Sequence, residues 1–305
     1  MTQEYELIII GGGPAGLTAG IYAARARLNT LLIERGLCGG QIVDAELVEN
    51  FPGFPHGIHG GELGQSVYEQ AMKFGLRVVN TEVSALNLKE RQNIVNTSEG
   101  TFAAKAVIIA SGCERRKLGV PREAALTGRG VSYCATCDAP FFKNKAVACV
   151  GGGDRALSEA LHLTKFASKV SVIHRRDQFR AARIVQEKTQ ADPKIEFILN
   201  SVVEGLEGKD VLEGLKLRDT VTGKESDLKV AGVFVCIGLK PNTEYLKGSL
   251  SLDEQGYIIT NDRMGTDIPG VFAAGDIRHN SPQQAITAAG DGATAAIYAQ
   301  RFLGE

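Results

Sequence analysis

Two cysteines three positions apart, Cys134 and Cys137, are the residues of this sequence best placed to do chemistry. A Cys-x-x-Cys pair beside a strand-helix-strand pattern suits a redox disulfide, because its short ring lets dithiol and disulfide interconvert at accessible potentials. Asp138 follows directly and could cap a helix or exchange a proton with a thiol or a flavin. The pair therefore predicts thiol-disulfide chemistry.

Zinc binding is the alternative reading of such a pair. A structural zinc site takes about four ligands, yet the sequence contains no second Cys-x-x-Cys. Its histidines are scattered, at positions 56, 59, 162, 174 and 279, and its other cysteines, at 38, 113, 149 and 236, lie in or beside apolar segments or glycine turns. We expect no metal, and we expect those four cysteines to be small core residues.

Two glycine-rich turns flank the cysteine pair and form an internal repeat. Gly11-Gly12-Gly13-Pro14-Ala15-Gly16 follows the apolar run 6–10, and Gly151-Gly152-Gly153-Asp154-Arg155-Ala156 follows the run 146–150. Each turn precedes a helical pattern, around 17–28 and 157–167, and a second apolar run, 30–33 and 170–173. Such turns let backbone N–H groups and a helix N-terminus meet a pyrophosphate. The sequence predicts two dinucleotide sites.

The residue that ends the second run of each repeat separates the two sites. Glu34, 18 positions after Gly16, can accept hydrogen bonds from ribose hydroxyls, as in FAD or NAD sites. His174 stands 18 positions after Ala156 and is followed by basic residues. Guanidinium groups suit a 2′-phosphate, so the second site predicts NADP(H). The basic residues are Arg175, Arg176, Arg180 and Arg183, of which the last two could also form a solvated basic face.

A third segment, 267–276, returns to the first site. It reads as a turn and a short apolar strand ending in Gly275-Asp276, and a small-residue helix is expected over 286–302. The apolar runs 106–110 and 233–237 would be the strands of exit and return. The prediction is an α/β chain with two Rossmann-like dinucleotide-binding domains, the second inserted into the first: 1–115 with 243–305, and 116–242.

Composition excludes several other classes of function. The chain has 305 residues, 44% of them hydrophobic, and 34 basic against 35 acidic side chains, so no basic field exists for nucleic acid or anionic lipid. The apolar window 7–24 is interrupted by glycines and proline, which favours a strand and helix over a membrane span. The first six residues contain no basic residue and so lack the positively charged start that is typical of a secretory signal peptide. We expect a soluble cytoplasmic protein.

With these motifs in place, the chain resembles the low-molecular-weight, bacterial-type thioredoxin reductases over essentially its full length. The glycine turns, the Cys-Ala-Thr-Cys-Asp segment and the arginine cluster carry the resemblance. Further matches are Gly39-Gly40-Gln41, Glu49-Asn50-Phe51-Pro52-Gly53-Phe54, Asp177 with Phe179-Arg180-Ala181, and Ala274-Gly275-Asp276.

The resemblance implies two cofactors and a residue set for each. FAD would bind at the first site, with the pyrophosphate on the first turn, the ribose on Glu34 and the ribityl chain beside Asp276. Its residues would be Gly11, Gly13, Gly16, Glu34, Gln41, Asn50, Gly275, Asp276, Gln284 and Ala285. NADPH would bind at the second site through Gly151, Gly153, Ala156, Arg175, Arg176 and Arg180.

The resemblance also implies a reaction. NADPH would reduce FAD, FAD would reduce the Cys134–Cys137 disulfide, and the dithiol would reduce thioredoxin or a thioredoxin-like protein. Cys137 would be the thiol nearest the flavin, and Asp138 the acid/base group. A single pair must meet both the flavin and a protein, so rotation of the inserted domain about 112–119 and 238–243 is expected. A homodimer is expected by resemblance alone.

The sequence motifs are also compatible with other functions. A related flavin disulfide reductase could serve another redoxin or a peroxidase, or take electrons from ferredoxin, although the arginine cluster argues against ferredoxin. A ferredoxin–NADP reductase-like electron carrier would work without Cys134. A non-catalytic nucleotide-sensing or zinc-binding protein would hold no flavin.

Three positions depart from the family pattern. Arg155 and Ser158 stand where a small residue and a glutamate are more usual, and Gln283 stands where an arginine commonly precedes Gln284. These departures bear on how the nicotinamide half is held and on the domain interface.

Overall fold

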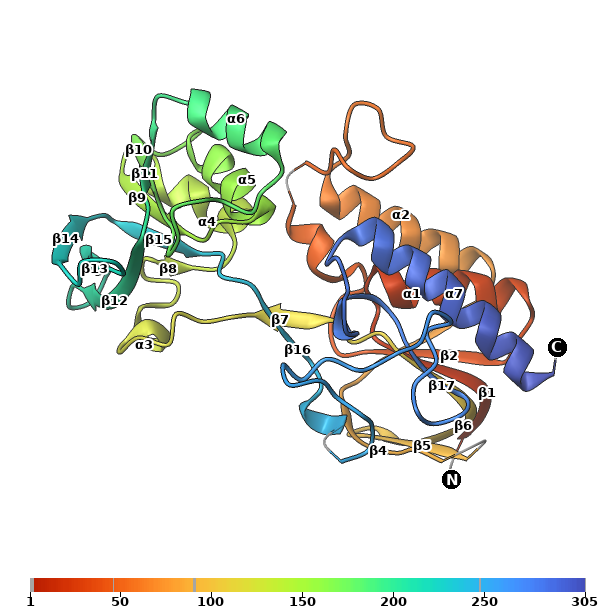
Figure 1. Ribbon diagram of the computed structural model, residues 1–305. Coiled ribbons are helices and arrows are strands. Elements are labelled where there is room, and N and C mark those ends of the chain that lie inside the picture. Colours follow the sequence, from red (N-terminus) through yellow and green to blue (C-terminus); the bar gives the residue numbers. More distant parts are fainter. Residues whose placement is uncertain (1–2, 46, 90–91, 247, 305) are drawn as a thin grey trace. The chain divides into compact units, whose positions relative to one another are not determined.

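A computed structural model describes residues 3–45, 47–89, 92–246 and 248–304. The chain folds into two compact units, one made of Met1–Glu114 with Lys240–Glu305 and one made of Arg115–Leu239 (Figure 1). The crossings expected at 115/116 and 242/243 compare with 114/115 and 239/240 in the structure. The outermost residues of the expected first domain, 1–2 and 305, lie outside the described residues.

The first unit is built on a parallel sheet in the order β3-β2-β1-β6-β17. Leu7 of β1 lies opposite Thr30 of β2 and Ala106 of β6. Strands β4 and β5 extend β6 as an antiparallel meander. The strands are β1 (Gln3–Ile10), β2 (Thr30–Glu34), β3 (Arg77–Asn80), β4 (Val83–Asn87), β5 (Asn93–Thr97), β6 (Gly100–Ile109) and β17 (Val271–Ala273).

Helices cover one face of this sheet. Leu7 and Ile9 of β1 belong to the core on the helical face, and Ile8 and Ile10 to the core on the opposite face. This alternation follows from the two-residue period of a strand. The helices are α1 (Pro14–Arg25), α2 (Gly60–Lys73) and α7 (Ala285–Leu303), with shorter turns η1 (Gly40–Asp44), η3 (Glu244–Leu246) and η4 (Gly275–Ile277).

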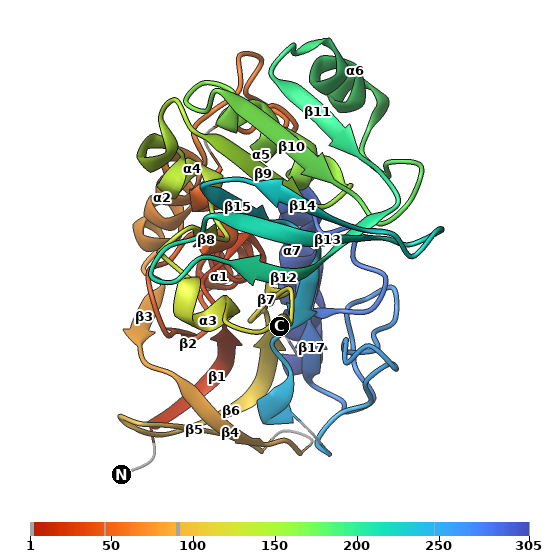
Figure 2. The same cartoon turned by 90° about the vertical axis from the view of Figure 1, so that its left-hand side faces the viewer.

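The second unit repeats the same architecture (Figure 2). Its parallel sheet has the order β11-β10-β9-β15-β8, and β12-β13-β14 form a separate antiparallel sheet. The strands are β8 (Val131–Ser132), β9 (Ala146–Val150), β10 (Lys169–Ile173), β11 (Ile195–Ile198), β12 (Ser201–Glu207), β13 (Gly214–Asp219), β14 (Glu225–Lys229) and β15 (Gly232–Val235). The helices are α3 (Glu123–Leu126), α4 (Ala135–Asp138), α5 (Asp154–Leu163), α6 (Arg183–Ala191) and the turn η2 (Ala139–Phe142).

The internal repeat is therefore structural as well as sequential. Strands β1, β2, β3, β6 and β17 have the same relative order as β9, β10, β11, β15 and β8. The predicted fold class, two Rossmann-like domains, is confirmed. The helix expected around 157–167 begins earlier, at Asp154, because Gly153 already serves as its N-cap. Across the described residues, no helix combines the length and apolar composition needed to cross a membrane.

The chain passes between the units along two short strands, β7 (Cys113–Arg115) and β16 (Leu239–Pro241), which pair with each other. Gly112 and Gly238 next to them have φ values of +59° and +106°. A Cβ at either position would meet nothing within 4 Å. Both glycines thus supply left-handed backbone in open surroundings at the crossings.

Candidate functional site

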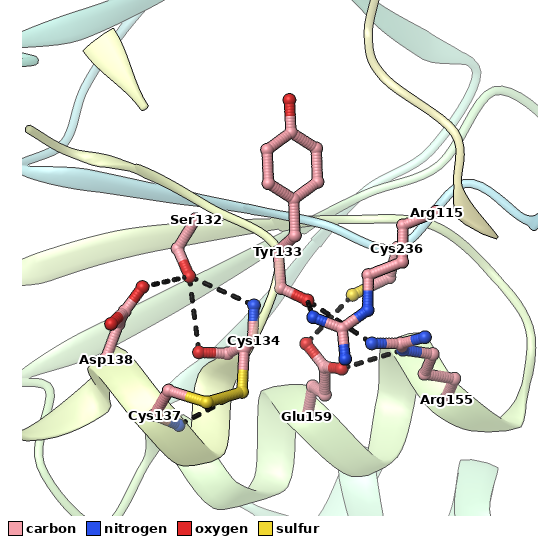
Figure 3. The surroundings of a disulfide bond; sticks show 9 residues. All are labelled: Arg115, Ser132, Tyr133, Cys134, Cys137, Asp138, Arg155, Glu159 and Cys236. Carbon is pink, nitrogen blue, oxygen red and sulfur yellow. Dashed lines mark hydrogen bonds and ion pairs between the residues drawn. A yellow bond between two sulfur atoms is a disulfide. The ribbon is translucent and has the colours of Figure 1, made fainter. Parts of the chain in front are cut away.

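Cys134 and Cys137 form a disulfide at the start of α4, with their Cα atoms 5.4 Å apart (Figure 3). Strand β8 ends at Ser132, so the pair follows the carboxyl end of a parallel strand. Cys134 is the N-cap of α4, and its Sγ accepts a hydrogen bond from the Cys137 N–H at 3.2 Å. Cys134 is buried and Cys137 is exposed. Of the two sulfur-bearing residues, Cys137 is the one in contact with solvent.

Ser132 connects the pair to Asp138, and sequence reasoning did not single it out. Its Oγ lies 2.7 Å from Asp138 Oδ2 and accepts a hydrogen bond from the Cys134 N–H at 3.1 Å (Figure 3). The only sequence signal is a hydroxyl residue two positions before the first cysteine. Asp138, the acid predicted for proton exchange, is therefore held by a hydrogen bond from a residue that no sequence motif indicates.

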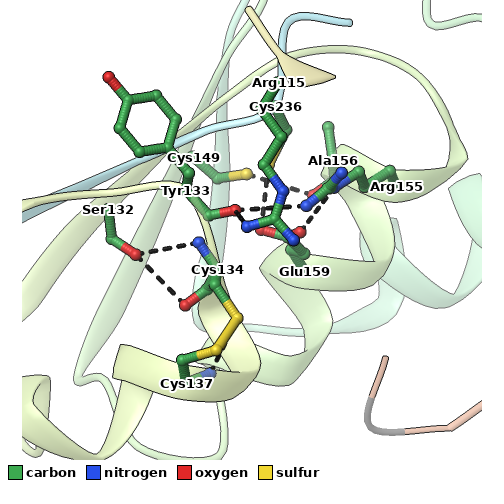
Figure 4. A network of polar contacts seen from close by, with 10 residues as sticks. All are labelled: Arg115, Ser132, Tyr133, Cys134, Cys137, Cys149, Arg155, Ala156, Glu159 and Cys236. Carbon is green, nitrogen blue, oxygen red and sulfur yellow. Dashed lines mark hydrogen bonds and ion pairs between the residues drawn. A yellow bond between two sulfur atoms is a disulfide. The ribbon is translucent and has the colours of Figure 1, made fainter. Parts of the chain in front are cut away.

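The carbonyl oxygen of Tyr133, the peptide group before Cys134, lies among arginines (Figure 4). Arg115 Nη1 donates to it, and Arg155 Nη2 donates at 3.2 Å. Arg155 Nε also pairs with Glu159 Oε1 at 2.8 Å, one helical turn along α5. Arg155, a departure from the family pattern, thus ties the first turn of α5 to the redox segment. Ser158, the second departure, is exposed.

Two further thiols lie behind this network (Figure 4). Cys236 donates its thiol hydrogen to Glu159 Oε2 at 3.0 Å, and Cys149 donates to the Ala156 carbonyl at 3.3 Å. The hydrogen bond with Cys149 and burial raise the pKa of Cys236 well above its usual range. A protonated thiol is a poor nucleophile. Cys236 therefore acts as a packing residue, as the sequence suggested. Cys149 does so as well, because it is fully buried within β9.

In the first glycine turn, Gly11 and Gly16 are required by packing and Gly13 is not. A Cβ on Gly11 would lie 2.3 Å from the Ala110 carbonyl oxygen, and a Cβ on Gly16 would lie 1.8 Å from the Gly11 carbonyl oxygen. A Cβ on Gly13 would meet only the Gly40 Cα, at 3.8 Å. Gly13 is the N-cap of α1, and no side chain caps this helix. Open space thus faces uncapped N–H groups, as a pyrophosphate requires.

The second glycine turn has the same design. A Cβ on Gly151 would lie 2.3 Å from the Cys236 carbonyl oxygen, and one on Gly152 would meet the His174 ring at 2.3 Å. A Cβ on Gly153 would meet nothing within 4 Å, and Gly153 is the N-cap of α5 without a side-chain cap. Ala156, in the first turn of α5, is buried. This turn also presents open space to a helix N-terminus.

The residues at the end of the second strand of each repeat, Glu34 and His174, differ as the sequence suggested. Glu34 accepts hydrogen bonds from the N–H groups of Gly12 at 2.6 Å and Gly36 at 2.9 Å, which leaves lone pairs for hydroxyl donors. His174 is turned inward: its Nε2 lies 3.0 Å from the Gln178 carbonyl, and burial lowers its pKa. The histidine therefore takes no part in an exposed phosphate site.

The arginines that follow His174 are available to an anion. Arg175, Arg176 and Arg180 are exposed, and within the described residues none of them forms an ion pair. The Arg180 N–H donates to the Gly152 carbonyl at 2.7 Å, which fixes this segment against the glycine turn. Three guanidinium groups without an ion pair in the described part of the chain, beside the second glycine turn, suit a phosphate ester.

Asp276 lies close to the first turn and has little hydrogen bonding of its own. Burial raises the pKa of Asp276 to about 6. Its carboxylate has one hydrogen bond within the described residues, from Ser281 Oγ at 3.4 Å. Gly275, with φ of +80°, brings the backbone close to Ala15: a Cβ there would lie 2.9 Å from the Ala15 Cβ. A half-buried, weakly bonded carboxylate fits an approaching set of hydroxyl donors such as a ribityl chain.

Four more of the predicted residues lie in the first unit, and three of them meet at one helix N-terminus. Gln41 Nε2 donates to the Cys113 carbonyl at 2.5 Å, and Asn50 Nδ2 donates to Gln284 Oε1 at 3.1 Å. Gln284 is the N-cap of α7 and Ala285 its first residue. Gln283, the third departure, has φ of +58° and its Nε2 donates to the Tyr257 hydroxyl at 3.2 Å. Segments more than 200 residues apart thus meet at the N-terminus of α7.

Substitutions of Gly13, the N-cap of α1, and of Gly16, within α1, should affect flavin binding and fold stability differently. Gly13→Val should change the free energy of unfolding by less than about 1 kcal/mol, because the backbone is extended and a Cβ there would meet only the Gly40 Cα, at 3.8 Å. The variant should nevertheless lose most bound flavin. Gly16→Ala should destabilise the fold by about 2–3 kcal/mol through overpacking. Urea unfolding and flavin content would check both; full flavin content in Gly13→Val would contradict the assignment of this turn.

Asp276 predicts a pH dependence for the flavin-free protein. The pKa of Asp276 is about 6 in the folded chain against an ordinary value of 3.8, so the folded chain binds this proton more tightly than the unfolded chain does. The resulting contribution of Asp276 to the free energy of unfolding is therefore fully present below about pH 4 and is lost as the pH rises to about 6. The loss amounts to about 3 kcal/mol at most. Asp276→Asn should remove the fall and be the more stable form at pH 7. Parallel stability curves for the two proteins, measured by urea unfolding, would refute this.

Comparisons with known proteins agree with this geometry. Residues 5–292 match the family model described as pyridine nucleotide-disulphide oxidoreductase. The thioredoxin reductase of Bacillus subtilis strain 168 is 46% identical over 308 residues, covering 100% of this chain and 97% of the relative. That of Mycolicibacterium smegmatis is 48% identical over 302 residues, covering 99% and 97%. The solved thioredoxin reductase of Lactococcus lactis superposes with a TM-score of 0.96 at 40% identity, covering 98% of this chain and 99% of that one.

Proposed function

Because the chain belongs to the pyridine nucleotide-disulphide oxidoreductase family, we propose that it is an NADPH-dependent thioredoxin reductase. The observation that carries the proposal is the Cys134–Cys137 disulfide, which stands in the same unit as an uncapped dinucleotide turn and an unpaired arginine cluster. Full-length relatives and solved structures bear the same name.

The first unit would hold FAD. Gly11 and Gly16 shape the turn, and Gly13 leaves room for the pyrophosphate at the N-terminus of α1. Glu34 would accept from the ribose hydroxyls, and Asp276 from the ribityl chain. The remaining residues are Gln41, Asn50, Gly275, Gln284 and Ala285, the last two placing the positive N-terminus of α7 toward the flavin.

The second unit would hold NADPH. Gly151, Gly153 and Ala156 form the turn, with open space above Gly153. Arg175, Arg176 and Arg180 would bind the 2′-phosphate through charge-assisted hydrogen bonds. This cluster favours NADPH over ferredoxin as the electron donor.

The bound nicotinamide and flavin would supply the two electrons that convert the disulfide to a dithiol. Cys134 and Cys137 then carry out exchange with the partner's disulfide, and Asp138 holds the proton that a thiol gives up. We assign Cys137 as the thiol nearest the flavin. The dithiol would return to the disulfide as the partner's two sulfurs leave as thiols.

Features beside the pair suit a protein partner. Phe141, close after Asp138, is 73% exposed and offers an apolar contact to a partner beside the redox segment. Thioredoxin or a thioredoxin-like protein would dock here. Rotation of the second unit, permitted by Gly112 and Gly238, would let one disulfide serve two reaction partners. A homodimer and a cytoplasmic location remain predictions.

The experiment is a donor and acceptor test on the purified flavoprotein. With NADPH and oxidised thioredoxin, alkylation and mass spectrometry should show both thioredoxin thiols formed. Reduced ferredoxin in place of NADPH should give none. Thiol formation with ferredoxin alone would favour the ferredoxin-dependent alternative, and failure with every donor would refute a reductase.

A further inference from the structure

Ser132 has an unusually demanding position for a serine. It is 3% exposed, at the last residue of β8, and three polar atoms surround its hydroxyl. Its Oγ lies 2.7 Å from Asp138 Oδ2, 3.1 Å from the Cys134 nitrogen and 3.2 Å from the Cys134 carbonyl oxygen. A buried hydroxyl is costly unless it is hydrogen-bonded, and here every option involves the redox segment.

The number of protons decides how these contacts are used. A hydroxyl has one hydrogen to donate, while the Cys134 N–H must be the donor in its own contact. Ser132 therefore donates either to Asp138 or to the Cys134 carbonyl. The 2.7 Å contact with Asp138 has the usual length of an O–H···O bond, and the 3.2 Å contact does not. With Asp138 ionised, the bond to Asp138 prevails.

Asp138 depends on this bond. Within the described residues, its carboxylate accepts a hydrogen bond only from Ser132. The contact between Ser132 and Cys134 alone would be an ordinary serine turn. The bond to Asp138 adds a link between the predicted acid/base group and the peptide group of the buried cysteine.

We propose that Ser132 is a positioning residue of the dithiol exchange, which holds the Asp138 carboxylate and the Cys134 peptide in one hydrogen-bonded unit. The inference rests on the proposed function. It assigns to Ser132 no contact with substrate or cofactor; Ser132 acts through Asp138.

The exchange step shows what the link does. One thiol of the pair gives its proton to Asp138, so an S–H bond breaks and an O–H bond forms. The thiolate attacks the partner's disulfide, one S–S bond forms as another breaks, and the leaving sulfur takes the proton back from Asp138. While Asp138 is protonated, Ser132 Oγ can accept a hydrogen bond from the Asp138 carboxyl group and donate its own hydrogen to the Cys134 carbonyl oxygen. No proton leaves Ser132.

The test is a double-mutant cycle on the full flavoprotein, with kcat for thioredoxin reduction by NADPH as the readout. We expect Asp138→Ala to lower kcat about a hundredfold and Ser132→Ala about tenfold, a coupling of ordinary size. The double variant should equal Asp138→Ala alone, because Ser132 works only through Asp138. The KM for NADPH should be unchanged in all three.

Ser171 offers a matched control. It is also 3% exposed, lies in β10 of the same unit, and donates to a carboxylate, Glu196, at 2.6 Å. Ser171→Ala should stay within about twofold of the wild type. Ser132→Thr, which keeps the hydroxyl at a strand position, should stay within about threefold and protects the test if Ser132→Ala does not fold.

The outcomes distinguish the role of Ser132 from the proposed function. If Ser132→Ala lowers kcat by the same factor with and without Asp138→Ala, or does not lower it, the inference is wrong although the proposed function stands. If the wild-type protein reduces no thioredoxin, the proposed function itself fails.

Discussion

Cys134→Ser is expected to lower the rate of thioredoxin reduction by at least about a thousandfold, while the protein stays folded and retains its flavin. A serine oxygen cannot form a disulfide, and none of the other cysteines in the described chain is exposed or disulfide-bonded, so none could replace this pair. Loss of a covalent participant costs far more than loss of a binding contact. The measurement is NADPH consumption with oxidised thioredoxin.

Two comparisons make this result specific to the redox pair. NADPH consumption with ferricyanide, which needs no thiol, should be nearly unchanged in Cys134→Ser. Cys236→Ser is the matched control, because a serine hydroxyl can donate the same hydrogen bond to Glu159 as the thiol does. It should reduce thioredoxin at nearly the wild-type rate. Full thioredoxin activity in Cys134→Ser would instead support an electron carrier that bypasses the pair.

The double substitution Arg175→Ala/Arg176→Ala is expected to raise the KM for NADPH about a hundredfold and leave kcat nearly unchanged. Each guanidinium makes charge-assisted bonds worth about 1.5 kcal/mol or more, and about 3 kcal/mol corresponds to a hundredfold. The KM for NADH, which has no 2′-phosphate, should stay the same. Steady-state kinetics with both nucleotides would measure this loss of preference.

Arg183 provides the control for charge alone. It is exposed and begins α6, close in sequence to the cluster, but it is not among the three arginines assigned to the phosphate. Arg183→Ala should change the KM for NADPH by less than about threefold. If it weakens NADPH as much as the double substitution, the 2′-phosphate is bound by a broader basic face, which was the alternative for this residue.

The parts of the fold that the sequence predicted are those set by short patterns. The strand, glycine turn and helix around Gly11 and Gly151 lie within about thirty residues each, and their repetition implied two similar sheets. The antiparallel strands were not foreseen: β14, Glu225–Lys229, has almost no apolar alternation to reveal it. Its pairing is determined by β13 rather than by its own composition.

For the candidate site, the sequence indicates the residues that belong to a short motif. Cys134, Cys137 and Glu34 are recognisable from spacing alone. The bond between Asn50 and Gln284 joins residues far apart in sequence, and Ser132 owes its contact with Asp138 to the turn of α4. Arg155 looked like a departure, and only the folded chain shows its guanidinium on the carbonyl before Cys134.

An electron balance on the purified wild-type protein tests most directly whether the Cys134–Cys137 pair passes electrons from NADPH to thioredoxin. NADPH is mixed with oxidised thioredoxin under anaerobic conditions, and the NADPH consumed and the thiols formed are counted together. Two new thioredoxin thiols are expected for each NADPH oxidised, and none in Cys134→Ser. NADPH oxidation without new thiols, or thiol formation that survives Cys134→Ser, would contradict this expectation.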